Sequence, residues 1–270
     1  ASGTTAVGWS RVAKQFEMNT DINADSIRSI SGLPTNQCIE TLFGAEALSR
    51  STFVEELSRA EREEILRAGG NLYQGVAEGL RELKENFKIL LVSNCPDWYL
   101  EAFFQLSGLK HFFDDAVCFG NNQLPKKENI RQIAKRNGCN KPVYVGDTHW
   151  DQHAAYYAGT KFIFAEYGFG SVNTKRCPAI NSFSELSQIF NSKTPAPKIE
   201  VRRLGVQEFS QAKEFYASVE YVQPLDPSSR YYAGFHGDKL IGIVRLAFEE
   251  NVWVLRGMQV IPKYQFLGIG

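Results

Sequence analysis

Hydrophobic residues recur every three or four positions over the first seventy residues of the chain, which is the spacing of amphipathic helices. The same spacing continues just beyond them, and Gly69-Gly70 separates the two parts. The stretches that fit the pattern are residues 11–16, 36–48, 52–68 and 76–85. The chain therefore opens with a helical segment.

From residue 87 the pattern changes to short apolar runs that alternate with helical stretches. The runs at 88–92, 116–119, 142–145 and 161–165 predict strands. The helices predicted between and after them cover residues 97–106, 127–137, 151–158 and 182–190. Strands separated by helices of this size indicate βαβ units and a parallel sheet, so this part is α/β.

A polar segment with two prolines, residues 191–198, reads as a linker. Beyond it a helix is predicted over 206–219, and His236-Gly237-Asp238 is a hairpin turn signal between two strands. The strands predicted in this part are residues 199–204, 231–235, 239–246 and 251–260. Antiparallel pairing of this kind indicates a second, α+β domain with a boundary near residue 195.

Composition narrows the class of protein. Apolar residues make up 43% and charged residues 22% of the 270 residues, and the formal net charge is zero. A neutral chain gives no electrostatic reason to expect nucleic acid or an anionic membrane as partner. No apolar run approaches the roughly 20 residues of a membrane span. Five scattered cysteines without a Cys-x-x-Cys pair favour reduced thiols, and we expect a cytoplasmic protein.

The residues most suited to a chemical function follow the end of the strand predicted at 142–145. Gly146-Asp147 follows this strand, and Asp151 comes four residues after Asp147. Ligands of open α/β sheets bind at the carboxyl ends of the strands. Two carboxylates there suit a hard divalent cation such as Mg²⁺, which often shares its oxygen ligands with a phosphate.

Three other features fall at comparable positions. Ser93 ends the strand at 88–92 with a hydroxyl that can donate to a phosphate oxygen. Lys126 stands just before a helix, where an ammonium can neutralise charge during phosphoryl transfer. A glycine-rich turn, residues 165–170, follows the last strand of the sheet. Each feature alone is common, and their order and spacing give them weight.

Residues 1–190 with these motifs resemble the haloacid dehalogenase-like hydrolases, in their phosphoglycolate-phosphatase-like branch. Ser93 matches the second family motif, Lys126 the third (with Lys127 as the fallback), and Asp147 with Asp151 the fourth. The resemblance implies a helical cap over 1–72 and a Rossmann-like core over 73–190. It also implies hydrolysis of a small phosphorylated metabolite through an aspartyl-phosphate. Asp147 and Asp151 would serve Mg²⁺, Asp151 through a bound water or by orienting the lysine.

The sequence departs from the family at its first motif, Asp-x-Asp-Gly-Thr, which supplies the nucleophile and the acid/base. The chain begins at Ala1, and its first aspartate, Asp21, falls inside the cap. The missing piece includes the central strand, which lies between the Ser93 strand and the Asp147 strand. We therefore expect a fragment without phosphatase activity of its own, and a gap, a rearranged pairing or marginal stability in the sheet.

Residues 199–270 resemble the first half of a GNAT-type N-acetyltransferase, a truncated α+β domain. The resemblance implies acetyl-CoA as cofactor and an amine acceptor near residues 220–230. A splay between the strands at 239–247 and 251–260 would admit the cofactor. The residues that would bind it are Gln265, Gly268 and Gly270 at the pyrophosphate and Met258, Gln259 and Val260 at the acetyl and pantetheine portion. The alternative is a small αβ module that only packs against the first domain.

The sequence as a whole favours a piece of a bifunctional protein, a phosphatase joined to an N-acetyltransferase. A start at alanine rather than methionine agrees with a piece of a longer reading frame. The competing hypothesis is a non-catalytic binding or scaffold protein derived from the same folds.

Overall fold

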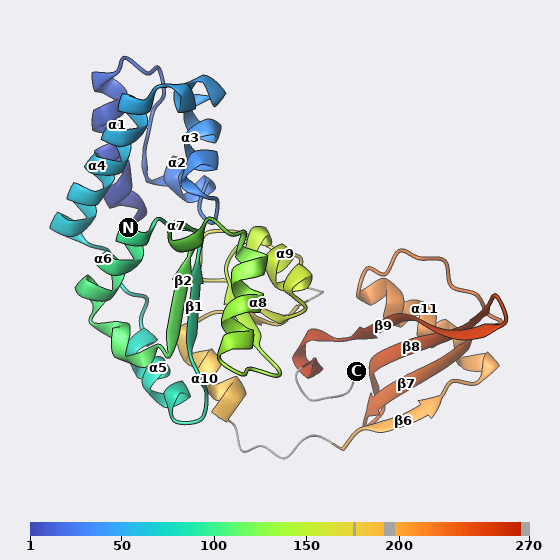
Figure 1. The fold of residues 1–270 in the computed structure, drawn as a ribbon. Helices are drawn as coiled ribbons and strands as arrows, with labels where there is room; N and C mark the ends of the chain where they lie inside the picture. The colour runs from blue at the N-terminus through green and yellow to red at the C-terminus, as the bar shows by residue number, and fades with distance from the viewer. Residues whose placement is uncertain (175–176, 192–197, 266–270) are drawn as a thin grey trace. The chain divides into compact units, whose positions relative to one another are not determined.

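The computed structural model describes residues 1–174, 177–191 and 198–265, and the chain divides into two units (Figure 1). The first unit comprises residues 1–172 and 180–192, and the second comprises residues 173–179 and 193–270. Most of the predicted linker lies outside the described residues, and the predicted limits of cap and core stay predictions. Within the described residues, no helix combines the length and apolar character that a membrane span requires.

The first seventy residues form a helical bundle around one apolar core. Its elements are α1 (Ser2–Gln15), α2 (Ala24–Ser29), α3 (Thr35–Phe43), the 3₁₀ helix η1 (Ala45–Ser49) and α4 (Ser51–Ala68). Trp9, Phe53 and Leu57 are among its buried side chains, each of which stabilises the fold by roughly 1.5–3 kcal/mol. Gly8 lets α1 approach α4 closely, because a Cβ at this position would lie 2.8 Å from the Ala60 carbonyl oxygen.

Three features of this bundle differ from the sequence-based prediction. The helix predicted over residues 36–48 is divided at Gly44, whose φ of +85° ends α3 before η1 begins. Helix α1 starts at Ser2, nine residues before the predicted start at residue 11, and α2 was not predicted. With six residues, α2 is too short to display a helical period. Its N-cap Asn23 accepts hydrogen bonds from the backbone N–H groups of Asp25 and Ser26, so capping rather than periodicity identifies it.

The α/β part of the first unit follows the predicted alternation closely. After α5 (Val76–Lys84), the strands are β1 (Leu90–Ser93), β2 (Asp115–Cys118), β3 (Val143–Gly146), β4 (Lys161–Ala165) and β5 (Ala179–Ile180). The helices are α6 (Asp97–Ser107), the short α7 (Phe119–Asn122), α8 (Lys126–Arg136), α9 (His149–Ala158) and α10 (Phe183–Asn191). The strands β1, β2 and β3 are each followed by a helix, whereas β4 is followed by the short strand β5, which was not predicted. Figure 1 labels β1, β2, α8 and α9 in this part of the chain.

The parallel strands form two separate sheets instead of one. Strand β1 pairs only with β2, and β3 belongs to a second sheet of order β3-β4-β5 in the part of the chain that the structure describes. Every residue of β1 and of β3 is only partly buried, whereas four of the five residues of β4 are buried. Central strands are normally the most buried of a parallel sheet. The predicted gap between the Ser93 and Asp147 strands is confirmed.

The second unit is an antiparallel sheet of order β6-β7-β8-β9 with α11 (Phe209–Ser218) packed on it. Its strands are β6 (Glu200–Arg203), β7 (Arg230–His236), β8 (Lys239–Glu249) and β9 (Val252–Val260). Gly237 and Asp238 form the predicted hairpin turn, because His236 pairs with Lys239.

The predicted splay between β8 and β9 is wrong. The two strands stay paired from Gly242–Val260 to Glu249–Val252, with one irregularity between Ile243 and Arg245. On β9, Gly257 takes a φ of +57°, a conformation that side chains disfavour. A bulge of this kind absorbs the irregularity locally, so the strands do not need to separate.

Candidate active site

Asp151 is fixed by the turn that joins β3 to α9. Thr148 is the N-cap of α9, and its hydroxyl oxygen accepts a hydrogen bond from the Asp151 backbone N–H at 3.1 Å. In return, Asp151 Oδ2 accepts from the Thr148 hydroxyl at 2.8 Å and from the Thr148 backbone N–H at 3.2 Å. This reciprocal capping box moves the helix start to His149 from the predicted residue 151. The Thr-x-x-Asp spacing could have revealed it.

Lys126 forms a buried ion pair with Asp151. The Nζ atom lies 2.6 Å from Asp151 Oδ1, and the two side chains are 10% and 5% exposed. The Tyr144 hydroxyl donates to the same carboxylate oxygen at 3.3 Å. Burial alone would lower the pKa of Lys126, but Tyr144 and Asp151 outweigh it and raise that pKa. Burial would likewise raise the pKa of Asp151, yet the charge of Lys126 holds it below its ordinary value. The site therefore keeps a fixed ammonium.

Asp147 is held by the glycine-rich turn that follows β4. The Phe169 backbone N–H donates to Asp147 Oδ2 at 2.8 Å, and the Gly170 N–H donates to the Asp147 carbonyl oxygen at 3.0 Å. A Cβ on Gly168 would overlap the Asp147 carboxyl group, and one on Gly170 would lie 2.5 Å from the Asp147 carbonyl oxygen. Only glycine permits this approach. Burial raises the pKa of the Asp147 carboxyl.

Ser93 ends β1, and the residue after it connects the sheet to the helical bundle. Ser93 Oγ accepts a hydrogen bond from the Cys95 backbone N–H at 3.2 Å. The Asn94 side-chain amide donates to the Gly32 carbonyl oxygen at 2.7 Å. Gly32 lies in the loop between α2 and α3, so this bond joins the two parts of the first unit beside the gap in the sheet.

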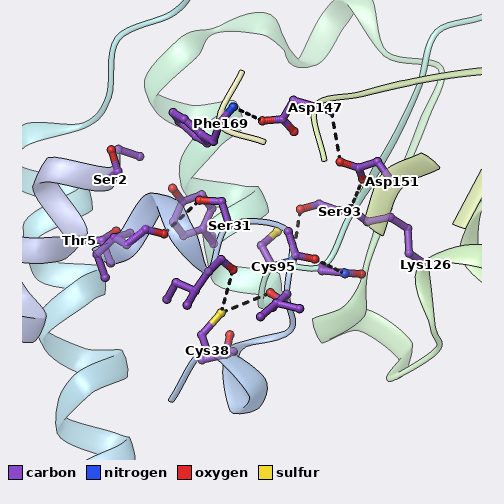
Figure 2. A pocket seen from close by; sticks show the side chains of 18 of the residues that line it. Ser2, Thr5, Ser31, Cys38, Ser93, Cys95, Lys126, Asp147, Asp151 and Phe169 are labelled. Carbon is purple, nitrogen blue, oxygen red and sulfur yellow. Dashed lines mark hydrogen bonds and ion pairs between the residues drawn. The ribbon is translucent and has the colours of Figure 1, made fainter. Parts of the chain in front are cut away.

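All four predicted catalytic residues line one cavity of ≈ 480 Å³. Figure 2 shows Lys126 and Asp151 next to each other, with Asp147 above them and Ser93 close by. The opposite wall comes from the helical bundle and includes Trp9, Cys38 and Glu61. The lining also contains residues of β1 and β3, among them Val92 and Val145, so the cavity reaches the gap between the two sheets. Tyr144 bridges the gap, since its hydroxyl lies 3.4 Å from the Val92 carbonyl oxygen.

None of the described residues that line the cavity is an aspartate free to act as the expected nucleophile. The acidic lining residues are Glu61, Asp147 and Asp151, and the last two are engaged as described above. Asp21 is exposed and does not line the cavity. The described part of the chain contains no cluster of three or more His, Cys, Asp or Glu side chains able to hold a metal ion. The five cysteines are free thiols, as expected from the sequence.

The residues predicted to bind acetyl-CoA are only partly described. Met258, Gln259 and Val260 lie at the end of the edge strand β9, and Met258 is 56% exposed. The Gln265 side-chain amide donates to the Val260 carbonyl oxygen at 3.0 Å. Gly268 and Gly270 lie outside the described residues. No pyrophosphate-binding loop is therefore assembled from the residues that are described.

Comparison with known proteins places the first unit in a family. A model described as haloacid dehalogenase-like hydrolase matches residues 4–165. None of the curated proteins compared matches the chain.

Solved structures share the fold at low identity. One, described as a predicted phosphoglycolate phosphatase from Haemophilus somnus 129PT, is 17% identical with a TM-score of 0.57, over 70% of this chain and 91% of its own. One named as a haloacid dehalogenase-like hydrolase from Bacteroides fragilis is 19% identical with a TM-score of 0.61, over 68% and 92%. β-Phosphoglucomutase from Clostridium difficile is 16% identical with a TM-score of 0.57, over 71% and 89%.

The family match covers more than half of the chain and includes the Ser93, Lys126 and Asp147 positions. It ends at residue 165, so the acetyltransferase resemblance of the second unit rests on sequence alone. The chain belongs to the haloacid dehalogenase-like hydrolases.

Proposed function

We propose that the first unit is the scaffold of a phosphatase for small phosphate esters. The observation that carries this proposal is the shared cavity, where an anchored ammonium, a strand-end hydroxyl and a buried carboxylate converge. Lys126 neutralises charge on the phosphoryl oxygens, which is the main contribution a protein makes to phosphoryl transfer. Ser93 orients the same oxygens by hydrogen bonding, and Asp151 orients the lysine.

Asp147 fits the role of a magnesium ligand. Phe169 occupies its Oδ2, while Oδ1 has no hydrogen-bond partner among the described residues and is an oxygen donor of the kind that Mg²⁺ prefers. Both oxygens of Asp151 already accept hydrogen bonds, which favours its lysine-orienting role over direct ligation. A bound Mg²⁺ would offset the negative charge of the phosphate and of the carboxylates around it.

The missing parts are a nucleophilic aspartate and an acid/base aspartate. We propose that an extended segment carrying both lies between β1 and β3, where each strand has an edge that no described strand pairs with. Strands that flank a third lie about 9.6 Å apart. In the described residues the Tyr144 hydroxyl links β3 to the Val92 carbonyl oxygen of β1. In the completed site the carboxylate attacks phosphorus, the alcohol leaves with a proton from the second aspartate, and water then hydrolyses the acyl phosphate.

Binding of inorganic phosphate tests whether the first unit provides the phosphate site of a phosphatase. With Mg²⁺ present, ³¹P NMR titration of inorganic phosphate should give saturable binding that Lys126→Ala weakens at least tenfold. Lys127→Ala is the matched control, because the neighbouring Lys127 is exposed and does not line the cavity. The chain alone should not hydrolyse p-nitrophenyl phosphate. Equal effects of the two lysine variants, or Asp147-dependent hydrolysis by the chain alone, would contradict the proposal.

The non-catalytic alternative uses the same cavity. A binding or scaffold protein would keep phosphate affinity but gain no activity when a segment with two aspartates is supplied. Activity on supplying that segment is thus the observation that separates the two hypotheses.

For the second unit, N-acetyltransfer from acetyl-CoA to an amine stays a proposal. Its support is the antiparallel order β6-β7-β8-β9 and the bulge at Gly257 in the edge strand, just before the predicted pyrophosphate loop. Thermal unfolding with acetyl-CoA tests it. A rise in the melting temperature with acetyl-CoA but not with acetate would support cofactor binding, and no change at millimolar acetyl-CoA would argue for a packing module.

A further inference from the structure

The second unit has a cavity of its own, with a volume of ≈ 620 Å³. One wall is the loop that joins α11 to β7, and the other wall is the pair of strands β8 and β9. Its lining includes four charged side chains, Asp226, Arg245, Glu249 and Arg256, next to the uncharged Tyr221 and Leu225. A cavity of this size accommodates a small molecule, and its charged groups restrict which molecule fits.

Two of the charges lie opposite each other in the sheet. Arg245 of β8 pairs in register with Arg256 of β9, and like charges in directly opposite positions of an antiparallel ladder are destabilising. Glu249 neutralises Arg256, because its carboxylate oxygens accept from Arg256 Nη2 at 2.6 Å and from Nε at 3.3 Å. No ion pair neutralises Arg245 in the part of the chain that the structure describes. A bound anionic group would relieve this repulsion.

The Arg245 guanidinium is anchored by the protein itself. Its Nη1 donates to the Pro224 carbonyl oxygen at 2.8 Å. Burial raises the pKa of the Tyr231 hydroxyl, and Arg245 opposes this effect by its charge and by hydrogen bonding. The Nε atom of Arg245 is buried, so a ligand would contact the terminal nitrogens, which have more N–H donors than these contacts use. Since Arg245 is only partly buried and lines the cavity, its charge is accessible there.

The two acidic residues of the lining are ionised and already engaged. Asp226 accepts from the Ser228 backbone N–H at 2.9 Å and from the hydroxyls of Ser228 and Ser229 at 2.6 Å and 3.2 Å. The hydrogen bonds from Ser228 lower the pKa of Asp226, and the hydrogen bond from Arg256 lowers that of Glu249. At neutral pH the cavity therefore contains both signs of charge and no net charge.

We infer that this cavity binds a free amino acid, with its carboxylate on Arg245 and its ammonium toward Asp226 or Glu249. A purely anionic ligand such as a phosphate would lie close to two carboxylates, and a purely cationic ligand would lie close to two guanidiniums. A zwitterion places each of its charges against the opposite one. The planar fork of an arginine matches the geometry of a carboxylate.

The role of this amino acid as an acetyl acceptor rests on the proposed N-acetyltransfer. Tyr221 and Asp226 of the lining fall within residues 220–230, where an amine acceptor is expected. In the transfer the amine nitrogen bonds to the acetyl carbon and the C–S bond of the thioester breaks. One ammonium proton goes to solvent and another to the sulfur, so that coenzyme A leaves as the thiol. Binding of the amino acid to the cavity does not depend on this reaction.

Calorimetric titration of the full chain near neutral pH, with and without acetyl-CoA, measures the binding. The probes are the standard amino acids and, for the one that binds most tightly, its deaminated acid and its decarboxylated amine. Inorganic phosphate and pyrophosphate are the anions without an amine. Arg245→Gln removes the charge, and Arg245→Lys keeps the charge but removes the fork. Arg203→Gln is the matched control, because Arg203 lies on β6 of the same sheet and does not line the cavity.

At least one standard amino acid should bind, and removal of its amine or of its carboxylate should weaken binding at least tenfold, the loss expected for a charge-assisted hydrogen bond. Arg245→Gln should weaken the amino acid at least tenfold and remove its advantage over the decarboxylated amine. Arg245→Lys should have an intermediate effect and Arg203→Gln none. The comparison of ligands uses the wild-type chain alone, so it decides the question even if a variant fails to fold.

Failure of every standard amino acid to bind in either condition would overturn the inference. Binding of the deaminated acid, phosphate or pyrophosphate as tightly as the amino acid would overturn it as well. Arg245-dependent binding of an amino acid by a chain on which acetyl-CoA has no effect would sustain the inference and overturn the proposed transfer. Acetylation confined to amines without a carboxylate would sustain the transfer and overturn the inference.

Discussion

Replacing Lys126 by methionine should destabilise the first unit far more than the same replacement at the exposed neighbour Lys127. The substitution keeps most of the side-chain volume and leaves the Asp151 carboxylate, 5% exposed, without its cation. Breaking a buried ion pair in this way typically costs 3–5 kcal/mol. Lys126 borders the cavity, where water can replace part of its contact, so we expect about 3 kcal/mol. With a urea m-value of about 2 kcal/mol/M, the unfolding midpoint should fall by about 1.5 M.

Urea denaturation of the full chain, followed by far-ultraviolet circular dichroism at pH 7, measures this loss. Lys127→Met is the control, because the exposed Lys127 loses only a contact with the Tyr157 ring, 5.7 Å from its Nζ, worth about 0.5–1 kcal/mol. Asp151→Asn should destabilise the wild-type chain but stabilise the Lys126→Met variant by about 1–2 kcal/mol, since it removes the unpaired charge.

The stability that the Lys126–Asp151 ion pair contributes changes with pH in a defined direction. Lys126 holds the pKa of Asp151 below its ordinary value of 3.8, so the contribution of the pair is complete above that value and is lost as the pH falls through the folded-state pKa. The difference between wild type and Lys126→Met should therefore be largest near neutrality and shrink below about pH 4. A Lys126→Met variant within about 1 kcal/mol of Lys127→Met at pH 7 would refute this account of the pair.

Three other predictions concern Glu61, Gly168 and Gly8. Burial raises the pKa of Glu61 from 4.5 to about 7. The contribution of this group to the free energy of unfolding is therefore fully present below pH 4.5 and is lost as the pH rises through 7. Glu61→Gln should remove that loss and gain up to about 3 kcal/mol over wild type between pH 5 and 8, less where cavity water reaches the carboxyl; parallel pH profiles in denaturation would contradict it. Gly168→Ala should displace Asp147 and weaken Mg²⁺-dependent phosphate binding at least tenfold in calorimetry, and unchanged binding would show that the close approach is unimportant. Gly8→Ala should destabilise by about 1–3 kcal/mol despite its gain in helix propensity, whereas Gly3→Ala in the same helix, with open space around it, should stabilise by up to about 1 kcal/mol; equal effects in thermal unfolding would contradict the contact with Ala60.

The sequence predicted what depends on local patterns. The alternation of strands and helices after residue 87 was correct to within about two residues at most ends, because buried strands and amphipathic helices have distinct periods. The spacing of Asp147 and Asp151 placed both carboxylates on one strand-to-helix turn. Absence of the first motif predicted the separation of β1 from β3, since a strand missing from the middle of a parallel sheet leaves its neighbours unpaired.

What the sequence did not predict depends on contacts between distant segments or on single residues. Trp9 and Glu61 are 52 positions apart, and neither belongs to a motif, so only the packing of α1 on α4 brings them to the same cavity. The hydroxyl of Tyr144 across the gap is equally invisible to pattern analysis. The splay expected between β8 and β9 failed because one glycine at positive φ accommodates the irregularity within a paired ladder.

The central claim is that the space between β1 and β3 receives a strand that completes a phosphatase. The direct measurement is hydrolysis of p-nitrophenyl phosphate with Mg²⁺ after adding a synthetic apolar peptide that ends in Asp-x-Asp-Gly-Thr. We predict activity that requires the peptide, disappears when its first aspartate is replaced by asparagine, and is lost in Lys126→Ala but kept in Lys127→Ala. A peptide that binds the chain without producing hydrolysis, or hydrolysis indifferent to Lys126, would contradict it.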